Sequence, residues 1–442
     1  MHRPSGARSK IQSKRFMSDL QQTILAYGKR ARAAARQLAR LSSEQKNAGL
    51  LAMADALEKN EAQILKANEK DLEGARARNL SAAMIDRLRL DPKRIRVMSD
   101  GIRQVAALAD PVGEVIREWT RPNELQIKKV RVPIGVVGII YESRPNVTSD
   151  AAVLCTKTGN ATILRGGSES IHSNLAIASA LSEGAASAGL PADAILLVPV
   201  TDRAAVEHLC GMDQYLDVIV PRGGKGLIET VVTHARMPVI KHYDGICILY
   251  VDSQADLGMA EKIVVNAKCQ RPGVCNAAET VLVHRLILDA FLQTTGKALA
   301  ANGVQLRCDP DALAAAQKIS EVRACAIAAE PADFTTEFLE LILAVKVVGG
   351  VDEAIEHIET HGSHHSDAII TADESTAERF LSEVDSATVY WNASTRFTDG
   401  GEFGFGAEIG ISTDKLHARG PMALEELTTY KYQLRGTGQV RS

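Results

Sequence analysis

The sequence predicts an α/β protein whose core is a doubly wound parallel sheet, and three observations support this prediction. From about residue 134 onward, short apolar runs alternate with helical segments, as in βαβ units. The run at 134–140 is continuously apolar, which is typical of a parallel strand buried on both faces. The chain has 442 residues, more than one core usually supports, so two or three domains are expected.

Composition narrows the class of protein and its surroundings. The formal net charge of −3 argues against nucleic acid or an anionic membrane as the main partner. The seven cysteines are scattered, odd in number and without paired metal-type spacing, which suits a reducing compartment and predicts a cytoplasmic protein. No apolar run approaches the roughly 20 residues that a membrane span needs, so no membrane partner is expected.

The first sixteen residues form a basic segment that contains serines and no acidic residue. We expect residues 1–16 to be a disordered extension ahead of a start at Met17, with a transit-type segment as the alternative. The segment has no apolar centre, which argues against a secretory signal.

Residues 19–116 are predicted to be helical. Ala, Leu, Arg, Glu and Lys dominate, and the apolar residues of 33–39 and 50–57 recur at helical spacing. Asp-Pro pairs at 91–92 and 110–111 interrupt the helical pattern.

The pattern changes to strands after Trp119. Residues 125–132 alternate apolar with polar, as a strand with one solvated face does, and the buried strand 134–140 follows. We then expect helices at 147–158, 170–188, 202–210 and 224–235, with strands at 161–164, 195–198 and 217–220. A second α/β stretch begins near residue 250 and includes a strand at 341–348 and a helix at 352–358. The last strand-like run, 427–434, could pair with 125–132, and the two would form an arm for a neighbouring subunit.

Two glycine-rich loops follow predicted strands at the edge where such sheets bind ligands. One carries Arg165, Gly166 and Ser168, and the other places Arg222, Gly223, Gly224 and Lys225 before a helix. Glycines let phosphate oxygens approach backbone N–H groups, and basic side chains add charge, although a plain βα turn is the alternative. The G-x-G-x-x-G motif does not follow the strand 134–140, so an ordinary Rossmann phosphate site is not supported.

Cys275 is the candidate nucleophile. It follows a Pro272-Gly273 turn, has Arg271 nearby and precedes an apolar strand, so a rigid turn could hold a thiolate. The alternative is a buried cysteine that packs as a small hydrophobe at the strand entry.

A histidine-rich segment invites a metal assignment but does not support one. His361, His364, His365 and Asp367 lack the H-E-x-x-H spacing, so we interpret the segment as a loop and predict no metal site.

Long motifs in the chain resemble one known family. Residues 270–276, with the sequence Gln-Arg-Pro-Gly-Val-Cys-Asn, are similar to the cysteine segment of the γ-glutamyl phosphate reductases, which belong to the aldehyde dehydrogenase superfamily. The other segments that resemble this family are 141–148, 221–227, 354–358, 361–367, 392–397 and 403–413. The similarity covers nearly everything after Met17.

The resemblance implies an activity and a reaction path. The expected reaction is the NADPH-dependent reduction of L-glutamyl 5-phosphate to L-glutamate 5-semialdehyde and phosphate, in proline biosynthesis. Cys275 would form a thioester, and the Asn146 side chain with the Cys275 N–H would hold the oxyanion. Oxidising members carry an activating Glu in an E-L-G-G segment, whereas residues 241–245 here are Lys-His-Tyr-Asp-Gly, which favours reduction of an acyl phosphate.

The resemblance also assigns ligand-binding residues. Glu337 falls where relatives carry a glutamate that binds the nicotinamide ribose. Arg165 and Ser168 stand where NAD-preferring relatives carry a lysine and a glutamate, so NADP is predicted. The neighbouring Glu169 weighs against this prediction. The remaining cofactor contacts are expected from Gly166, Arg222, Gly223, Gly224 and Lys225. For the substrate, Arg144 and Arg271 are candidates for the phosphate, while Ser394, Arg396 and Arg419 are candidates for the amino-acid end.

The implied architecture is an aldehyde dehydrogenase-like fold with a Rossmann-type cofactor domain (17–118 and 134–245), an α/β catalytic domain (246–423) and an oligomerisation arm (119–133 and 424–442). A homodimer or homotetramer is expected, and coupling to the upstream glutamate 5-kinase is plausible. An oxidising aldehyde dehydrogenase and a non-catalytic nucleotide-binding protein are the alternatives.

Overall fold

A computed structural model describes residues 6–441 and divides the chain into two compact units. Unit 1 comprises the chain up to Lys241 together with 405–410 and the C-terminal part from Met422. Unit 2 comprises 242–404 and 411–421. The first unit boundary at 241–242 lies close to the predicted one at 245–246.

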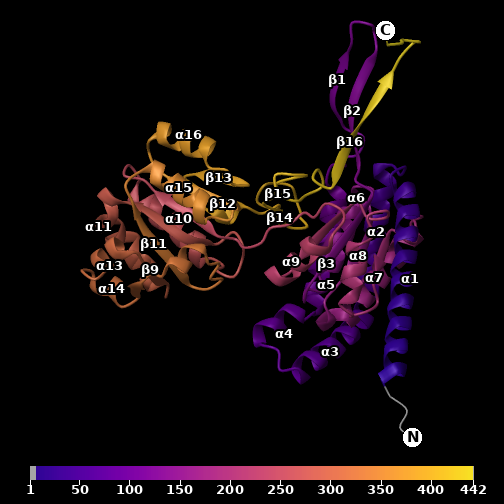
Figure 1. Ribbon diagram of the computed structural model, residues 1–442, viewed down its shortest axis with the longest axis horizontal. Helices are drawn as coiled ribbons and strands as arrows, with labels where there is room; N and C mark the ends of the chain where they lie inside the picture. The colour runs from indigo at the N-terminus through magenta and orange to yellow at the C-terminus, as the bar shows by residue number, and fades with distance from the viewer. Residues whose placement is uncertain (1–5, 442) are drawn as a thin grey trace. The chain divides into compact units, whose positions relative to one another are not determined.

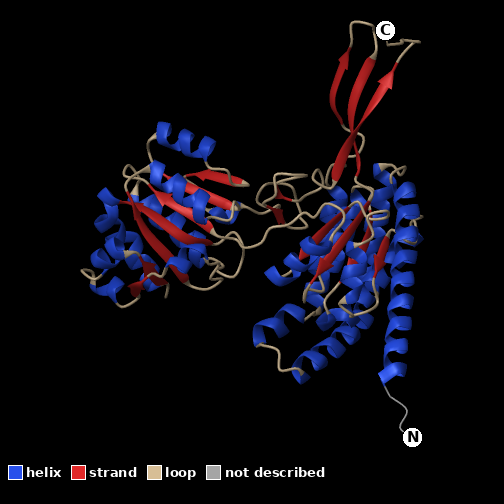
Figure 2. Ribbon diagram, in the orientation of Figure 1, coloured by secondary structure: helices blue, strands red, loops and turns tan. Residues whose placement is uncertain are grey.

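Unit 1 contains a parallel sheet of four strands covered by helices (Figures 1 and 2). The strand order is β5-β4-β3-β6, and every residue of the central strand β3 is buried. The strands are β3 (Val136–Tyr141), β4 (Ala161–Arg165), β5 (Ile195–Leu197) and β6 (Val218–Arg222). The helices are α1 (Gly6–Leu38), α2 (Ser43–Lys59), α3 (Glu61–Ala77), α4 (Ala82–Leu88), α5 (Pro92–Ala107), α6 (Val147–Lys157), α7 (Ile171–Ser187), α8 (Ala204–Cys210) and α9 (Lys225–His234).

These elements confirm the predicted alternation of strands and helices from residue 134 to residue 235, with ends that differ by a few residues. At the N-terminus, α1 begins at Gly6 and covers most of the segment that we expected to be a disordered extension. No proline or glycine lies between Gly6 and Gly28, so nothing in the sequence interrupts a helix there. Residues 1–5 lie outside the described part of the chain.

A separate three-stranded antiparallel sheet extends from the rest of unit 1 (Figure 1). It consists of β1 (Val115–Thr120), β2 (Gln126–Pro133) and β16 (Thr428–Arg435), in the order β1-β2-β16. The predicted pairing of the last strand with residues 125–132 is confirmed, since β16 pairs with β2 from Thr428↔Pro133 to Arg435↔Gln126. Strand β1 was missed, because its sequence shows no clear alternation and its partner is needed to reveal it.

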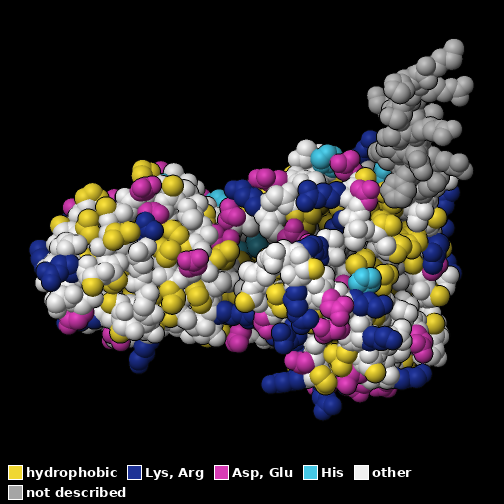
Figure 3. All heavy atoms as spheres, turned by 90° about the horizontal axis from the view of Figure 1, so that it is seen from below, with side chains coloured by type: hydrophobic (Ala, Val, Ile, Leu, Met, Phe, Trp, Pro, Cys, Tyr) yellow, Lys and Arg dark blue, Asp and Glu magenta, His cyan; other side chains and the backbone are white. Residues whose placement is uncertain are grey.

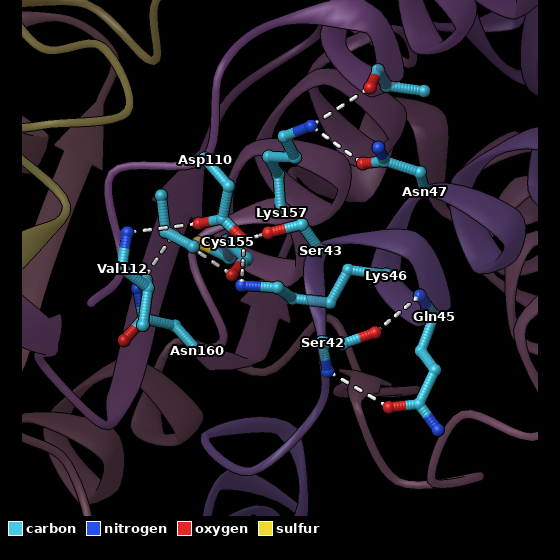
Figure 4. Close-up of polar contacts among 12 residues, drawn as sticks. Ser42, Ser43, Gln45, Lys46, Asn47, Asp110, Val112, Cys155, Lys157 and Asn160 are labelled. Carbon is cyan, nitrogen blue, oxygen red and sulfur yellow. Dashed lines mark hydrogen bonds and ion pairs between the residues drawn. The ribbon is translucent and has the colours of Figure 1, made fainter. Parts of the chain in front are cut away.

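A buried cluster of charges joins α2, α5 and α6 (Figure 4). Lys46 Nζ lies 2.5 Å from Asp110 Oδ2, with both side chains almost completely buried. Lys157 Nζ donates to Asn47 Oδ1 at 2.6 Å and to the Ala106 carbonyl at 2.9 Å. Burial lowers the pKa of Lys157. The cluster therefore connects α2 and the C-terminal end of α5 to α6.

Unit 2 contains a seven-stranded parallel sheet in the order β10-β9-β11-β8-β7-β12-β13, with apolar clusters on both of its faces. Its strands are β7 (Cys247–Val251), β8 (Ala278–His284), β9 (Gln305–Cys308), β10 (Ala326–Ala328), β11 (Ile342–Val348), β12 (Ser366–Ile370) and β13 (Thr388–Trp391), and β14 (Ile411–Ser412) pairs separately with β15 (Gly420–Pro421). Its helices are α10 (Leu257–Cys269), α11 (Leu288–Phe291), α12 (Lys297–Ala301), α13 (Pro310–Ala316), α14 (Ser320–Arg323), α15 (Val351–His361) and α16 (Glu374–Glu383).

Only residues 362–365 of the histidine-rich segment form a loop, since α15 ends at His361 and β12 begins at Ser366. His365 is fully buried in this strand entry, where its Nδ1 contacts the Ser366 hydroxyl at 2.8 Å. Desolvation lowers the pKa of His365 to about 3. Its ring therefore packs as a neutral group in the interior.

Over the described residues, no helix is long and apolar enough to cross a membrane. On the face shown in Figure 3, basic and acidic side chains are interspersed, as the small net charge implies.

Candidate active site

Cys275 lies in the turn between α10 and β8 of unit 2. The Ala277 N–H donates to the Val274 carbonyl at 3.0 Å, which closes a tight turn around the thiol residue. Cys275 is partly exposed, whereas β8 behind it is buried almost throughout. A buried strand and a closed turn hold the residue in one place, as the sequence predicted.

The backbone of Cys275 is contacted by one residue of β7, the strand that lies beside β8, and by one residue just before β7. Cys247, at the start of β7, places its Sγ 3.2 Å from the Cys275 carbonyl oxygen as a hydrogen-bond donor. Gly245 packs so closely that a β-carbon there would lie 2.6 Å from both the Cα and the carbonyl carbon of Cys275. Only glycine fits this contact.

Glu337 reaches the same backbone. Its Oε1 accepts the Gly245 N–H at 3.0 Å, and desolvation raises the pKa of Glu337. Two residues later, the Leu339 N–H donates to Glu279 at 3.4 Å, and Glu279 forms a fully buried ion pair with Lys268 at 2.6 Å. Glu337, the glutamate predicted to bind the nicotinamide ribose, is therefore linked to Cys275 through Gly245, which contacts both residues.

Two guanidinium groups gather near the thiol. Arg396 Nε donates to Gln270 Oε1 at 2.8 Å, and Gln270 directly precedes Arg271. Burial, followed by the nearby charge of Arg271, lowers the pKa of Arg396, while Asp399 and, to a smaller extent, Cys275 oppose that effect. Ser394 Oγ accepts the Arg396 N–H at 3.3 Å, so this serine shapes the loop that carries the arginine. Adjacent positive charges beside a nucleophile are suited to an anionic substrate.

Arg419 has a different environment. Its Nη1 donates to Asp385 Oδ1 and its Nη2 to the Asp385 carbonyl, each at 2.7 Å. The structure therefore gives Arg419 a partner in Asp385, and its assignment to the amino-acid end of the substrate stays a prediction.

Asn146 begins α6 in unit 1, where β3 ends. Its Nδ2 donates to Asp150 Oδ2 at 2.8 Å, and Asp150 Oδ1 accepts the Ser149 hydroxyl at 3.2 Å. An acceptor-only carboxylate fixes which end of the amide is the NH₂ group. Arg144, two residues earlier in the same loop, is exposed.

Arg165 ends β4 and is largely buried. Its Nη2 donates to the Thr201 carbonyl at 3.0 Å, while its Nε is buried without a partner among the described residues. Gly166 is needed for packing, since a β-carbon there would lie 3.1 Å from the Tyr141 ring. The Ser168 hydroxyl donates to Glu169 at 3.0 Å, so the glutamate that weighed against NADP lies at this loop.

The second glycine-rich loop begins α9. Gly224 donates its N–H to Glu142 Oε2 at 2.9 Å, so a carboxylate occupies the N-terminal end of this helix, where anions are favoured. Arg222 packs its guanidinium against the backbone of Gly410. Lys225, the first residue of α9, is exposed.

Sequence reasoning missed several residues that surround the site. Glu142 follows β3 at the ligand-binding edge, a position that could have drawn attention to it. Asn276 and Thr395 lie inside motifs that carried the family resemblance, but their role depends on contacts across more than a hundred residues. No local pattern pointed to Cys247, because its contact with Cys275 depends on which strand lies beside β8.

Comparison with known proteins first establishes the class. The profile of the aldehyde dehydrogenase family matches residues 16–324. An acetylating aldehyde dehydrogenase from Geobacillus thermoglucosidasius shares the fold, with a TM-score of 0.66 at 18% identity over 97% of this chain and 99% of that chain. The fold is therefore that of the aldehyde dehydrogenases, as predicted.

More similar proteins define the family within this class. The γ-glutamyl phosphate reductase of Opitutus terrae is 54% identical over 426 residues, which is 96% of this chain and 100% of the relative. That of Moorella thermoacetica is 56% identical over 414 residues, 94% and 97% of the two chains. The crystal structure of the γ-glutamyl phosphate reductase from Thermotoga maritima superimposes with a TM-score of 0.91 at 45% identity, covering 95% of this chain and 100% of that one. The chain belongs to the γ-glutamyl phosphate reductase family of the aldehyde dehydrogenases, and is an oxidoreductase.

Proposed function

We propose that the protein catalyses the NADPH-dependent reduction of L-glutamyl 5-phosphate to L-glutamate 5-semialdehyde and phosphate, through a thioester on Cys275. The observation that carries the proposal is the partly exposed Cys275 in its closed turn, near enough to Arg396 for their charges to interact, with Arg271 interacting with Arg396 in turn. A thiol in this positive environment can attack an anionic acyl phosphate, whose leaving group needs positive charge. The names of the relatives support the same substrate.

The reaction begins with the Cys275 thiolate. Its sulfur forms a bond to the acyl carbon, the carbon–oxygen bond to phosphate breaks, and phosphate leaves with the electron pair. In the second half, the thioester carbon would accept a hydride, its bond to sulfur would break, and the Cys275 thiolate would leave with the electron pair of that bond. Each half passes through an oxyanion, for which the Asn146 amide and the Cys275 N–H are the proposed donors. Arg271 and Arg144 would bind the phosphate, and Arg396, Arg419 and Ser394 the amino-acid end.

The residues around the glycine-rich loops fit a nicotinamide dinucleotide. Arg222 and Lys225 are the proposed positive charges for the cofactor's phosphates, beside the N-terminus of α9 where the Glu142 carboxylate accepts the Gly224 N–H, and the buried, unpartnered Nε of Arg165 is an unused donor. Glu337 would accept hydrogen bonds from the nicotinamide ribose. When bound, the reduced nicotinamide supplies the hydride. Gly166, Gly223 and Gly224 are the proposed backbone contacts of the cofactor in these two loops.

Water must be kept from the thioester, and the chain lacks the residue that oxidising relatives use to activate it. Residues 241–245 carry no glutamate at that position. Glu337, which comes from a different part of unit 2, accepts the Gly245 N–H. The reductive reaction is therefore favoured over oxidation of an aldehyde.

The preference for NADPH rests on Arg165 and Ser168. Replacing a carboxylate by a serine removes repulsion against a 2′-phosphate, and an arginine adds attraction. The ratio of kcat/KM for NADPH to that for NADH should exceed one; a ratio at or below one contradicts the assignment.

The test of the proposed function is the reverse reaction. Pyrroline carboxylate, in equilibrium with the open semialdehyde, is supplied with phosphate and NADP to wild type and to Cys275→Ala. NADPH formation that requires phosphate and is lost in the variant is the expected result. Turnover that ignores phosphate would identify an oxidising dehydrogenase, and no turnover with either cofactor would favour a non-catalytic protein.

The same proposal places the protein in proline biosynthesis in the cytoplasm, where the product cyclises spontaneously. The three-stranded arm is proposed to join subunits into a dimer or tetramer. It carries exposed apolar side chains, including Ile116, Tyr430, Tyr432 and Leu434. Functional coupling to glutamate 5-kinase belongs to this proposal as well.

A further inference from the structure

Asn276, the residue directly after the nucleophile, is held in place by hydrogen bonds of its own side chain and of Thr395, neither of which takes a direct part in the proposed reaction. Thr395 Oγ1 donates to the carbonyl oxygen of Asn276 at 2.7 Å. In the opposite direction, Asn276 Nδ2 donates to the Thr398 carbonyl at 2.9 Å and to the Arg396 carbonyl at 3.3 Å. Residue 276, directly after Cys275, is thus tied by three hydrogen bonds to a segment about 120 residues away.

The segment 395–398 is itself attached to the large sheet of unit 2 through Thr398. Thr398 is fully buried, and its hydroxyl contacts Ser366 Oγ at 2.6 Å, Thr388 Oγ1 at 2.8 Å and Tyr390 Oη at 2.7 Å. Ser366 begins β12, and the other two lie on β13. The segment 395–398 is therefore fastened to two strands of the large sheet, and can transmit their position to residue 276.

Asn276 is retained at a cost. The residue is buried, and its Oδ1 has no hydrogen-bond partner among the described residues. Buried polar atoms are usually paired, and an unpaired one destabilises the fold. Both amide hydrogens are used on carbonyl groups of the segment 395–398, so the benefit of the side chain lies in this attachment.

The attached segment also carries a proposed substrate residue. Arg396 lies between Thr395 and Thr398, and its Nε returns to Gln270, which is on the nucleophile side. The Arg396 carbonyl accepts a hydrogen bond from Asn276, and the Arg396 side chain donates one to Gln270. These two bonds restrict how far the guanidinium can move relative to the Cys275 thiol. A displacement of residues 395–398 would move the anion-binding group and the nucleophile relative to each other.

We propose that Asn276 and Thr395 are positioning residues that set the Cys275 thiol in register with Arg396, so that anion recognition and nucleophilic attack share one rigid frame. The inference rests on the proposed function for its kinetic part. Its structural part concerns only the orientation and reactivity of the thiol, which can be measured without substrate.

The test compares three threonine variants of the full-length protein. Thr395→Val keeps the shape of the side chain and removes its hydroxyl donor, while Thr395→Ser restores a donor. Thr371→Val is the matched control, because Thr371 is also buried in unit 2 and donates its hydroxyl to Asp252 Oδ2 at 2.8 Å. Two quantities are measured for each folded variant: kcat and KM in the NADPH-dependent reaction, and the pH dependence of Cys275 alkylation by iodoacetamide. Peptide mass mapping separates Cys275 from the other cysteines.

We expect Thr395→Val to lower kcat by about 10- to 100-fold, since misplacement of a reacting group by about 1 Å costs on the order of 10²-fold. The KM for NADPH should stay near the wild-type value, the alkylation profile should shift, and Thr395→Ser should restore both readouts. Thr371→Val should lower the melting temperature and leave both readouts unchanged. Wild-type alkylation and kcat in Thr395→Val, or equal losses in Thr371→Val, would overturn the proposal.

The alkylation arm separates this inference from the proposed function. If the wild-type protein shows no phosphate-dependent turnover, the proposed function fails. A shifted alkylation profile in Thr395→Val alone would still support the positioning role. Should Thr395→Val not fold, Asn276→Ala tests the same attachment from the other side, with the same expected losses.

Discussion

The contact between Gly245 and Cys275 allows a prediction whose size follows from the structure. In Gly245→Ala, the new β-carbon would lie 2.6 Å from the Cα and the carbonyl carbon of Cys275, and closer still to the carbonyl oxygen. Carbon atoms prefer separations of about 3.5–4.0 Å, so one of the two backbones must move by roughly 1 Å. The neighbour is backbone rather than the end of a flexible side chain, so a small rotation cannot relieve the overlap.

A movement of that size acts directly on the nucleophile. Misplacement by about 1 Å costs on the order of 10²-fold in rate, which is roughly 2.7 kcal/mol of activation free energy. Overpacking should also lower the free energy of unfolding by about 1–3 kcal/mol. We therefore expect Gly245→Ala to fold with reduced stability and to lose about 10²-fold in kcat.

The assay is phosphate-dependent NADPH formation, with stability measured by urea unfolding of the same preparations. Gly258→Ala is the control, since Gly258 is an exposed residue near the start of α10 and a β-carbon there meets only Asp256 Oδ1, at 3.3 Å. Wild-type kcat in a folded Gly245→Ala protein would refute the reasoning, because it would mean that the turn around Cys275 can shift without loss of function.

Three further predictions concern unit 2 and the arm. Lys268→Met leaves Glu279 buried without its partner and should lower the free energy of unfolding by about 3–5 kcal/mol. Adding Glu279→Gln should restore part of this loss. An unchanged urea midpoint in Lys268→Met would contradict the prediction. Burial raises the pKa of Asp367 to about 7. The interior therefore favours the protonated form, so its contribution to the free energy of unfolding is complete below about pH 4 and is lost as pH rises through about 7, by at most about 4 kcal/mol. Asp367→Asn should remove this pH-dependent loss. If urea unfolding gives the same difference between wild type and Asp367→Asn at about pH 5 and pH 8, the assignment is wrong. Tyr432→Asp places a charge on the exposed apolar face of the arm and should reduce the particle mass in light scattering, whereas an unchanged mass would exclude this face from the subunit contact.

The local pattern of the chain determined much of the fold. Continuous apolar runs identified the buried parallel strands, and periodic segments between them identified the helices, because both depend on short-range spacing. The turn that holds Cys275 was also local, since Pro272 and Gly273 restrict the backbone directly before it. Alternation along 125–132 was enough to indicate a strand with one exposed face, and thus a partner for 427–434.

Contacts between distant segments were decided only in the tertiary structure. The pairing of β7 with β8 brings Cys247 and Gly245 to the backbone of Cys275, and no local pattern specifies which strands become neighbours. The same holds for Arg419, whose sequence context suggested a substrate contact but whose guanidinium meets Asp385. A side chain's chemistry can be read from its type, whereas its partner depends on how sheets and loops converge. The sequence therefore identified the nucleophile and its class of protein, and the packing of unit 2 determined what holds that nucleophile in place.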